Sequence, residues 1–306
     1  MKDYLKKALL FCAFILAKGA FATAYPVPTE NQALIGNLVY TTIGFNDNIV
    51  DLAKKYDIGY NSLEHANPHL NLAHPLHMGY NLQIPTQHLL PDLPRKGIVV
   101  NLPEMRMYYY TKDAVYTYPI GIGKIGKTLP VAQAVITRKV RDPSWAPTPD
   151  IRVFDLRELG IVLPTIMPPG PDNPLGSYAI YMSIPTFLIH STIFPESIGK
   201  RASFGCVRLY EKDIQDFFPT VEKGVPVVVV NAPVKLGWHE NAFYMEVHQP
   251  LEESGVESDV KLPHMVEMIM KEEKKTKMLI DWQRVAYMAA EKDGIPHPIG
   301  IKISKK

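Results

Sequence analysis

The sequence is poor in cysteine, in net charge and in long hydrophobic runs. It has 306 residues and only two cysteines, Cys12 and Cys206, which excludes a small disulfide-rich scaffold. The formal net charge is +2, and four lysines against one aspartate in the first 22 residues account for more than this excess. Nothing therefore favours a polyanionic partner such as nucleic acid. The apolar run from Ala8 to Ala17 is about half of the ~20 residues that span a bilayer, which argues against a membrane anchor.

The first 22 residues instead have the order of parts found in a secretory signal peptide. A basic start precedes the apolar run, and small residues follow it up to Ala22 and at Ala24. This order predicts export, with cleavage after Ala22 or after Ala24. Cleavage at either place removes Cys12 and leaves Cys206 as the only thiol. In an oxidising compartment a single thiol is either buried and inert or kept because it reacts, so the residues around Cys206 must decide.

Residues 38–86 are predicted to form a small βααβ unit of their own. The apolar residues of two short segments lie on one face at helical spacing, and β-branched or alternating segments flank them. The expected elements are a strand over 38–43, a helix capped by Asp47 or Asn48, a second helix capped by Asn61 or Ser62 and stopped at Asn67-Pro68, and a closing strand over 81–85.

This unit resembles a LysM domain across nearly its whole length. The resemblance rests on the Asp-Asn-Ile helix start, on Leu52-Ala53-Lys54-Lys55-Tyr56, on Ala66-Asn67-Pro68 and on the final Gly-x-x-Leu-x-Ile-Pro. It implies binding of the N-acetylated sugars of glycan chains. Asn46 stands where the family usually has glycine, and asparagine tolerates the same left-handed backbone. The alternative is a packing domain without a ligand.

Five histidines gather in or near this unit, and they raise the question of a metal site. They are His65, His69, His74, His77 and His88. Most lie in Pro- and Asn-rich loops without cysteine or carboxylate partners at ligand spacing, so the pattern argues against zinc, and no metal site is predicted.

From Gly97 onward the pattern changes to short strands, which predicts a mostly antiparallel β region. Eight prolines between Asp142 and Pro174 interrupt that region and predict an irregular flap. Glu211–Phe218 is expected to be a short helix, and the tail from Pro263 to Asp293 to be charged helices. The expected strands are 98–102, 105–110, 115–122, 133–139, 178–183, 186–190, 225–231 and 243–247.

The chemistry-bearing residues are His190, at the end of a predicted strand, and Cys206, in a loop before a helix. A thiolate is the attacking form of cysteine, and a neighbouring imidazole can accept its proton. Gly205 removes bulk beside the sulfur, and the N–H groups of Gly205 and Cys206 could face a developing oxyanion. From the residues alone, a nucleophile with its base and two residues that are merely near in sequence both stay open.

This segment resembles the signature of the YkuD-type L,D-transpeptidases. The signature is a histidine followed, after a gap, by Ser/Thr-His-Gly-Cys, a small apolar residue and Asn or Arg. Here the corresponding residues are His190 and Ser203-Phe204-Gly205-Cys206-Val207-Arg208. Further stretches are similar to Gram-negative members that carry a LysM domain, namely 89–92, 119–123, 169–174, 198–199, 233–235 and 237–238. The resemblance implies Cys206 as nucleophile, His190 as base, the Ser191 carbonyl as the group that orients the imidazole, and Gly205 with Cys206 as the oxyanion hole.

Two departures from the signature bear on rate and substrate. Phe204 replaces its second histidine, and Ser191 and Ile193 replace the Gly and Asn of the commoner His-Gly-Thr-Asn. The family's base is the first histidine, so activity is expected to survive, with a pseudoenzyme as the alternative. Arg208 is either a surface charge or a substrate-binding guanidinium that holds a carboxylate.

The expected fold is mostly β with α. It comprises a signal peptide (1–22), a βααβ LysM domain (38–86), a YkuD-type β-sandwich catalytic domain (97–232) and a partly helical C-terminal extension (233–306). The resemblance implies a periplasmic enzyme that transfers the acyl group of meso-diaminopimelate in a tetrapeptide stem of peptidoglycan to an amine. That amine belongs either to a second stem, which gives a 3-3 cross-link, or to an envelope protein. No cofactor is needed. An L,D-carboxypeptidase and a non-catalytic peptidoglycan-binding scaffold remain the alternatives.

Overall fold

The computed structural model describes residues 23–72, 76–252 and 260–303. The predicted signal peptide, residues 1–22, and His74 therefore lie outside the described residues. Within the described part, no helix combines the length and the apolar character that crossing a membrane requires.

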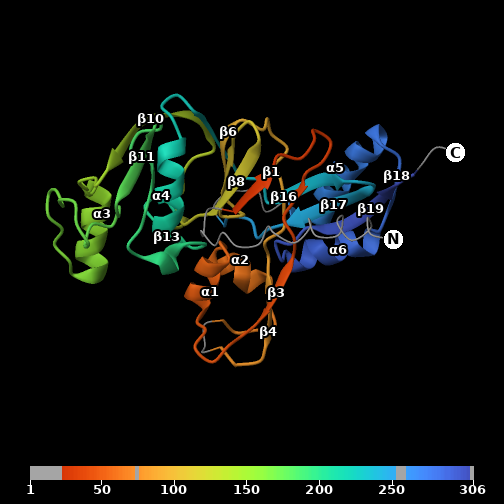
Figure 1. Ribbon diagram of the computed structural model, residues 1–306, viewed down its shortest axis with the longest axis horizontal. Helices are drawn as coiled ribbons and strands as arrows, with labels where there is room; N and C mark the ends of the chain where they lie inside the picture. Colours follow the sequence, from red (N-terminus) through yellow and green to blue (C-terminus); the bar gives the residue numbers. More distant parts are fainter. Residues whose placement is uncertain (1–22, 73–75, 253–259, 304–306) are drawn as a thin grey trace, which may run out of the picture.

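A nine-stranded sheet forms the centre of the molecule (Figure 1). All its pairings are antiparallel except β6–β15 and β12–β14, so the predicted mostly antiparallel β region is confirmed. All eight predicted strands are present, seven of them in this sheet and the one over 243–247 in the C-terminal region. In spatial order the sheet contains β1 (Thr23–Pro26), β8 (Ala114–Pro119), β7 (Arg106–Tyr110), β6 (Gly97–Asn101), β15 (Pro226–Val230), β10 (Ala132–Arg141), β11 (Tyr178–Met182), β12 (Leu188–His190) and β14 (Val207–Arg208). Two further short strands, β9 (Ile122–Gly123) and β13 (Arg201–Ser203), pair with each other.

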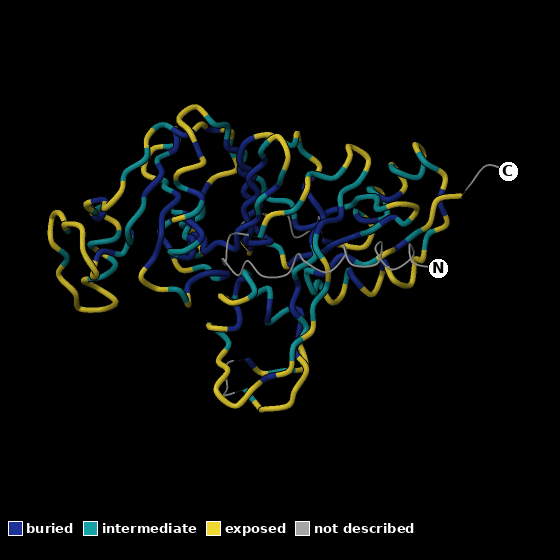
Figure 2. Tube along the Cα trace, viewed as in Figure 1, coloured by how far each residue is buried: buried dark blue, intermediate teal, exposed yellow. Residues whose placement is uncertain are grey.

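Strand β10 joins the two halves of this sheet. Its first residues pair with β15 and its later ones with β11, with a register shift between Ile136 and Arg138. Helix α4 (Glu211–Thr220) touches both halves, since Phe217 packs on Tyr109 of β7 and Phe218 on Tyr178 of β11. The main core therefore lies between the two halves of the sheet and α4. The two layers of the expected sandwich thus belong to one continuous sheet, joined by β10. Figure 2 shows this buried interior in dark blue.

The βααβ unit is present, with one cap different from the prediction. It consists of β3 (Val39–Thr42), α1 (Ile49–Lys55), α2 (Tyr60–His65) and β4 (Asn81–Ile84). The Asn48 side chain caps α1 by accepting from the Asp51 N–H at 2.9 Å. Helix α2 begins instead after Gly59, without a side-chain cap. The expected caps Asn61 and Ser62 lie inside the helix.

The reason is that α2 is capped by another part of the chain. The N–H groups of Tyr60 and Asn61 donate to the carbonyls of Ile198 and Gly199, at 3.1 and 3.2 Å. This requires two glycines in contact, because a Cβ on Gly59 would lie 2.6 Å from the Gly199 Cα. The βααβ unit is therefore docked on the segment that contains Ile198 and Gly199. The segment after it is also held, since β5 (His88–Leu89) pairs with β2 (Leu34–Ile35).

The C-terminal region is more than the helical tail expected from the sequence. The two predicted helices exist, but they pack on a four-stranded antiparallel sheet with a hydrophobic core of its own. Short strands separated by Gly, Pro and charge hide the sheet from a periodicity analysis. Its elements are β16 (Val234–His239), β17 (Ala242–Val247), α5 (Leu262–Lys275), β18 (Met278–Ile280), α6 (Trp282–Glu291) and β19 (His297–Lys302).

The predicted flap between β10 and β11 contains one helical segment. Helix α3 (Pro149–Phe154) continues into a π-helical turn (Asp155–Leu159), whereas the proline content had predicted no regular helix. Pro149 occupies the first turn, where a missing N–H costs nothing, and no proline follows until Pro164. Figure 2 shows the flap largely exposed.

Candidate active site

The register between β12 and β14 brings the three predicted polar residues to one place. Ile189 pairs with Val207, and His190 pairs with Arg208. Ile189 and Val207 are both fully buried in the main core. Because side chains alternate along a strand, His190, Arg208 and, by continuation of β14, Cys206 project from the opposite face. Neighbouring strands are about 4.8 Å apart, so the imidazole, the guanidinium and the thiol share one surface.

His190 is held as a neutral imidazole with a defined tautomer. Its Nδ1 lies 2.5 Å from the Ser191 carbonyl oxygen, so Nδ1 carries the hydrogen and Nε2 keeps its lone pair. The side chain is 3% exposed. Burial, followed by the charge of Arg208, lowers the pKa of His190 to about 4, against the opposing effect of hydrogen bonds to the Ser191 and Leu175 backbone. The ring is thus an unprotonated base at neutral pH.

Ser191 itself is fixed by its side chain. Its Oγ donates to the Leu175 carbonyl at 2.9 Å and accepts from the Tyr178 N–H at 3.1 Å. The residue is fully buried. Two hydrogen bonds therefore hold the backbone whose carbonyl contacts the imidazole.

Cys206 is the free thiol of the described residues and is partly exposed. Burial raises its pKa, while a hydrogen bond with the Leu188 backbone and the charge of Arg208 act in the opposite direction. Its Sγ lies 3.8 Å from the Thr186 carbonyl oxygen, and no hydrogen bond with His190 is present among the described residues. At neutral pH the thiol and the imidazole are therefore both uncharged.

The turn that carries Cys206 depends on Gly205 and Ser203. Gly205 has φ +107°, and a Cβ there would lie 2.3 Å from the Phe187 ring. The Ser203 Oγ accepts from the Gly205 N–H at 3.0 Å and donates to the Cys206 carbonyl at 2.7 Å. The Gly205 N–H is thus already used, and the Cys206 N–H is the member of the expected oxyanion pair that has no partner in the described part. Ser203 belongs to the signature segment, but the sequence analysis predicted no role for it.

Arg208 is a half-buried cation beside both reactive groups. Burial lowers its pKa, whereas Cys206 and Glu196 oppose this. Its Nε is buried and lacks a hydrogen-bond partner among the described residues. A buried donor without an acceptor is costly. Arg208 therefore fits the role of a guanidinium that binds a carboxylate better than that of a surface charge.

The charge of Arg208 should be visible in the titration of its neighbours. A positive charge opposes protonation of an imidazole and favours a thiolate. We therefore expect Arg208→Gln to raise the pKa of His190 from about 4 toward the ordinary 6.5, and to raise the pKa of Cys206 further. NMR titration of the imidazole and the pH dependence of thiol alkylation measure the two changes. Arg138→Gln, which changes an exposed arginine on β10, is the control. If the titration curves of Arg208→Gln match those of the wild type, the charge of Arg208 does not cause the pKa shifts of His190 and Cys206.

Phe204 connects the cysteine turn to the flap. Its ring packs edge-on against Phe154 of α3, with centroids 5.3 Å apart. The Lys124 ammonium lies over both rings, 3.8 Å from the Phe204 centroid and 3.1 Å from that of Phe154. Lys127 adds an ion pair with Asp150 at 2.5 Å. The residue that departs from the signature therefore holds the flap beside the thiol.

Asn173 closes the base of the same flap. It is 1% exposed. Its Nδ2 donates to the Pro143 and Pro168 carbonyls at 2.8 and 3.1 Å, and its Oδ1 accepts from the Leu175 N–H at 3.0 Å. One amide thus ties both ends of the flap to the segment next to Ser191.

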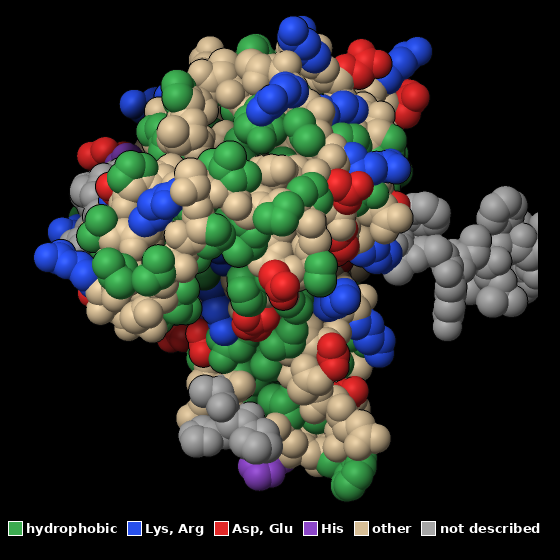
Figure 3. Space-filling view, turned by 90° about the vertical axis from the view of Figure 1, so that its left-hand side faces the viewer, with side chains coloured by type: hydrophobic (Ala, Val, Ile, Leu, Met, Phe, Trp, Pro, Cys, Tyr) green, Lys and Arg blue, Asp and Glu red, His purple; other side chains and the backbone are tan. Residues whose placement is uncertain are grey.

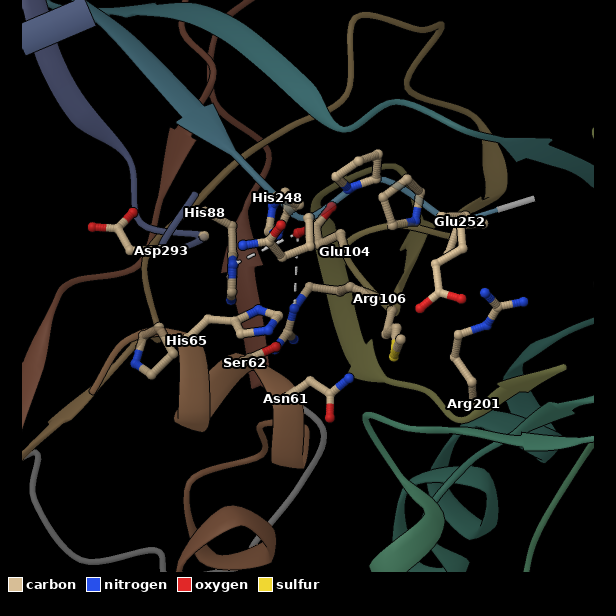
Figure 4. A pocket seen from close by; sticks show the side chains of 17 residues that line it. Asn61, Ser62, His65, His88, Glu104, Arg106, Arg201, His248, Glu252 and Asp293 are labelled. Carbon is tan, nitrogen blue, oxygen red and sulfur yellow. Dashed lines mark ion pairs between the residues drawn. The ribbon is translucent and has the colours of Figure 1, made fainter. Parts of the chain in front are cut away.

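A second polar cluster lies away from the thiol, beside a cavity of about 160 Å³ (Figure 4). Ligand atoms of His88, Glu104 and Glu246 lie within 4.8 Å of one another, a grouping that the sequence did not reveal. However, the Lys235 ammonium contacts Glu104 at 2.9 Å and Glu246 at 2.8 Å, so it already occupies the place of a cation. Burial acts to raise the pKa of Glu104, but Lys235, His248 and Arg106 outweigh it and lower the pKa to about 2. The cluster is a buried ion network between the central sheet and the C-terminal unit.

Comparisons with known proteins identify the family to which this chain is similar. A family model described as the L,D-transpeptidase catalytic domain, YkuD, matches residues 95–229. The chain is 40% identical to a probable L,D-transpeptidase YcfS of Escherichia coli (strain K12) over 249 residues, which cover 79% of this chain and 77% of that protein. It is 37% identical to the probable L,D-transpeptidase ErfK/SrfK of the same strain over 270 residues, 85% and 86% of the two chains.

Among solved structures, the catalytic domain of an L,D-transpeptidase from E. faecium covers 45% of this chain and 99% of its own. It has 23% identity and a TM-score of 0.35. Because the chain is 40% and 37% identical to these two relatives over more than three quarters of each protein, it belongs to the YkuD-type L,D-transpeptidase family.

Proposed function

We propose that this protein is a cysteine L,D-transpeptidase that acts on peptidoglycan, with Cys206 as nucleophile and His190 as base. The observation that supports this most directly is the β12–β14 register, which puts His190, Arg208 and Cys206 on one face of the sheet. The reaction class is inferred from the family to which the chain belongs, and the roles of the residues are inferred from the site.

In the proposed mechanism His190 Nε2 accepts the Cys206 proton as Sγ attacks the carbonyl of meso-diaminopimelate in a tetrapeptide stem. The Cys206 N–H stabilises the oxyanion, and Arg208 holds a carboxylate of the donor stem. The C–N bond to terminal D-Ala breaks, and the imidazolium returns the proton to the leaving amine. An amine then attacks the thioester and restores the thiol.

We propose two amines as acceptors. The amine of a second diaminopimelate gives a 3-3 cross-link, and an amine of an envelope protein attaches that protein to the wall. No metal or organic cofactor enters these steps.

The βααβ unit is proposed to bind glycan chains as a LysM domain. Two of its loops are joined by the main-chain hydrogen bonds Ile43 N–H to Tyr80 O and Gly79 N–H to Ile43 O, at 2.9 and 2.8 Å. They expose Phe45, Met78 and Tyr80, and Figure 3 shows hydrophobic side chains at the tip of this lower lobe. Exposed apolar side chains grouped in this way are typical of a binding surface.

Export to the periplasm is proposed on the signal-peptide pattern of residues 1–22. The proposed substrate lies outside the cytoplasm, which is consistent with this location.

The reaction is tested by incubating the exported protein with tetrapeptide muropeptides and weighing the products. A cross-linked dimer that has lost one D-Ala is expected, and Cys206→Ala should give none. Loss of D-Ala with gain of water would identify an L,D-carboxypeptidase, and unchanged muropeptides would contradict the proposal.

Glycan binding is tested separately from chemistry. We expect Tyr80→Ser to weaken binding to intact sacculi and to leave turnover of soluble muropeptides unchanged, because Tyr80 is 51% exposed and lies on the βααβ unit. Tyr287→Ser on α6, also an exposed tyrosine, is the matched control. Equal sedimentation of both variants with sacculi would rule out this surface.

A further inference from the structure

The first described residue, Thr23, is bound at the junction of the βααβ unit and the catalytic region. Thr23 begins β1, the edge strand of the nine-stranded sheet, and pairs with Thr117 of β8 (Figure 1). Both its N–H and its Oγ1 donate to Asp57 Oδ2, at 3.1 and 2.9 Å. Asp57 lies between α1 and α2, so a single carboxylate connects the start of β1 to the βααβ unit.

Asp57 forms a pair with Asp213 of α4, and this pair has no direct cation. Asp213 is 5% exposed. Its pKa is raised well above the ordinary value by burial first, and then by the charge of Asp57 and a hydrogen bond between the two carboxyls. Apart from each other, Asp57 Oδ1 and Asp213 Oδ2 have no hydrogen-bond partner in the described part of the chain, and both atoms are buried. A buried carboxyl beside a second, partly buried one must share a proton with it or receive a positive charge.

The neighbouring cations do not fill this role. Arg106 donates to the Asp57 carbonyl at 3.4 Å and to the Thr117 Oγ1 at 3.1 Å, not to either carboxylate. No ion pair of the described residues includes Asp57 or Asp213. The charged and titratable groups around the pair are Tyr25 on β1, Arg106 on β7, Tyr118 on β8, Tyr210, and Lys212 and Asp216 on α4.

We propose that the leader is cut between Ala22 and Thr23, and that the new α-ammonium group of Thr23 binds the Asp57–Asp213 carboxyl pair as its missing cation. A leader peptidase hydrolyses the Ala22–Thr23 bond; water gives its hydroxyl to the Ala22 carbonyl and a hydrogen to the Thr23 nitrogen, which takes one further proton from solvent. The inference rests on the proposed export.

The geometry selects between the two cleavage sites that the sequence left open. Cleavage after Ala22 leaves the nitrogen that already contacts Asp57 and converts a neutral donor into a charged one, which strengthens the hydrogen bond. Cleavage after Ala24 would remove Thr23 and with it both contacts to Asp57 and half of β1. Processing at Ala22 therefore completes an ion cluster that the uncut chain leaves short of one positive charge.

The first test is the mass of the protein exported with its own leader. A mature chain that begins at Thr23 is expected. A chain that begins at Tyr25 or elsewhere would overturn this inference and leave the export proposal intact, whereas a full-length chain in the cytosol would contradict export itself.

The second test compares the chain that starts at Thr23 with the same chain extended by Gly-Ser. An amine that gains an anionic partner on folding has a higher pKa in the folded than in the unfolded protein. Its contribution to stability is therefore complete below the unfolded-state pKa of about 8, and it is lost as the pH rises through the folded-state pKa. We expect the free-amine form to melt about 2–4 °C higher at pH 6.5, and this difference to disappear at high pH.

The variant that isolates the contact is D57N. Asp57 has φ +56°, and asparagine tolerates this conformation, so the fold should be kept. The melting difference should vanish in D57N and persist in D113N, an exposed aspartate near the other end of β1. NMR titration of the carbon-13-methylated terminal amine gives a readout independent of stability: its pKa should lie above about 8 and fall in D57N. An ordinary pKa, or a melting difference that survives D57N, would overturn the assignment.

Discussion

Replacement of His190 by alanine should slow acylation of Cys206 by ~10²–10⁴-fold, the range typical for loss of a general base. The imidazole is neutral at physiological pH because its pKa is lowered to about 4, and the pKa of the thiol is raised. Without the base, little of the thiol ionises at neutral pH. The measurement is an intact-mass time course with a carbapenem as the acylating reagent.

Cys206→Ala should abolish labelling altogether, because residues 23–306 contain no other thiol. His69→Ala, an exposed histidine on the βααβ unit, is the matched control and should label at the wild-type rate. Labelling of His190→Ala at that same rate would exclude His190 from proton transfer.

Lys235→Met should destabilise the protein by about 3–5 kcal/mol, as expected when one member of a buried ion cluster is removed. The ammonium bridges Glu104 and Glu246, whose side chains are 2% and 0% exposed, and methionine leaves two carboxylates buried together. Urea unfolding at pH 7 measures the loss.

The loss of stability caused by Lys235→Met should become smaller as the pH falls. The ion network lowers the pKa of Glu104 to about 2, so its contribution to stability is present above the ordinary glutamate pKa and is lost as the pH falls toward 2. The variant should therefore approach the wild type in acid. Lys277→Met removes an exposed ion pair to Glu273 and should change little at any pH; equal losses in both variants would show that burial of the cluster is not the cause.

The strand and the helix that flank the candidate site were predicted because their sequence patterns are local. Leu188–His190 and Glu211–Phe218 were predicted from strand and helix patterns, and both are present. The predicted residues His190, Arg208 and Cys206 do lie together. The pairing of β12 with β14 could not be predicted, because β14 has only two residues and a strand that short has no periodicity.

The misses share a physical cause, which is stabilisation by distant segments. The α2 cap was wrong because carbonyls of Ile198 and Gly199 take the place of a side chain. The pairing of β17 with β19 and the contact of Lys235 with Glu104 were missed because the partners lie far apart in sequence. Nothing local marks a lysine as the centre of a buried cluster.

Under the proposed export, the parallel pairing of β6 with β15 affects the order in which the chain folds. It joins Ile98 to Val227, and Asn101 fixes the same edge through two hydrogen bonds with Ala232. A chain that crosses a membrane from its amino terminus therefore delivers β6 long before its partner, and pairing between distant segments is slow. The open strand edge is meanwhile exposed to wrong partners. Since residues 23–306 hold a single thiol, no internal disulfide can trap a misfolded form during that wait.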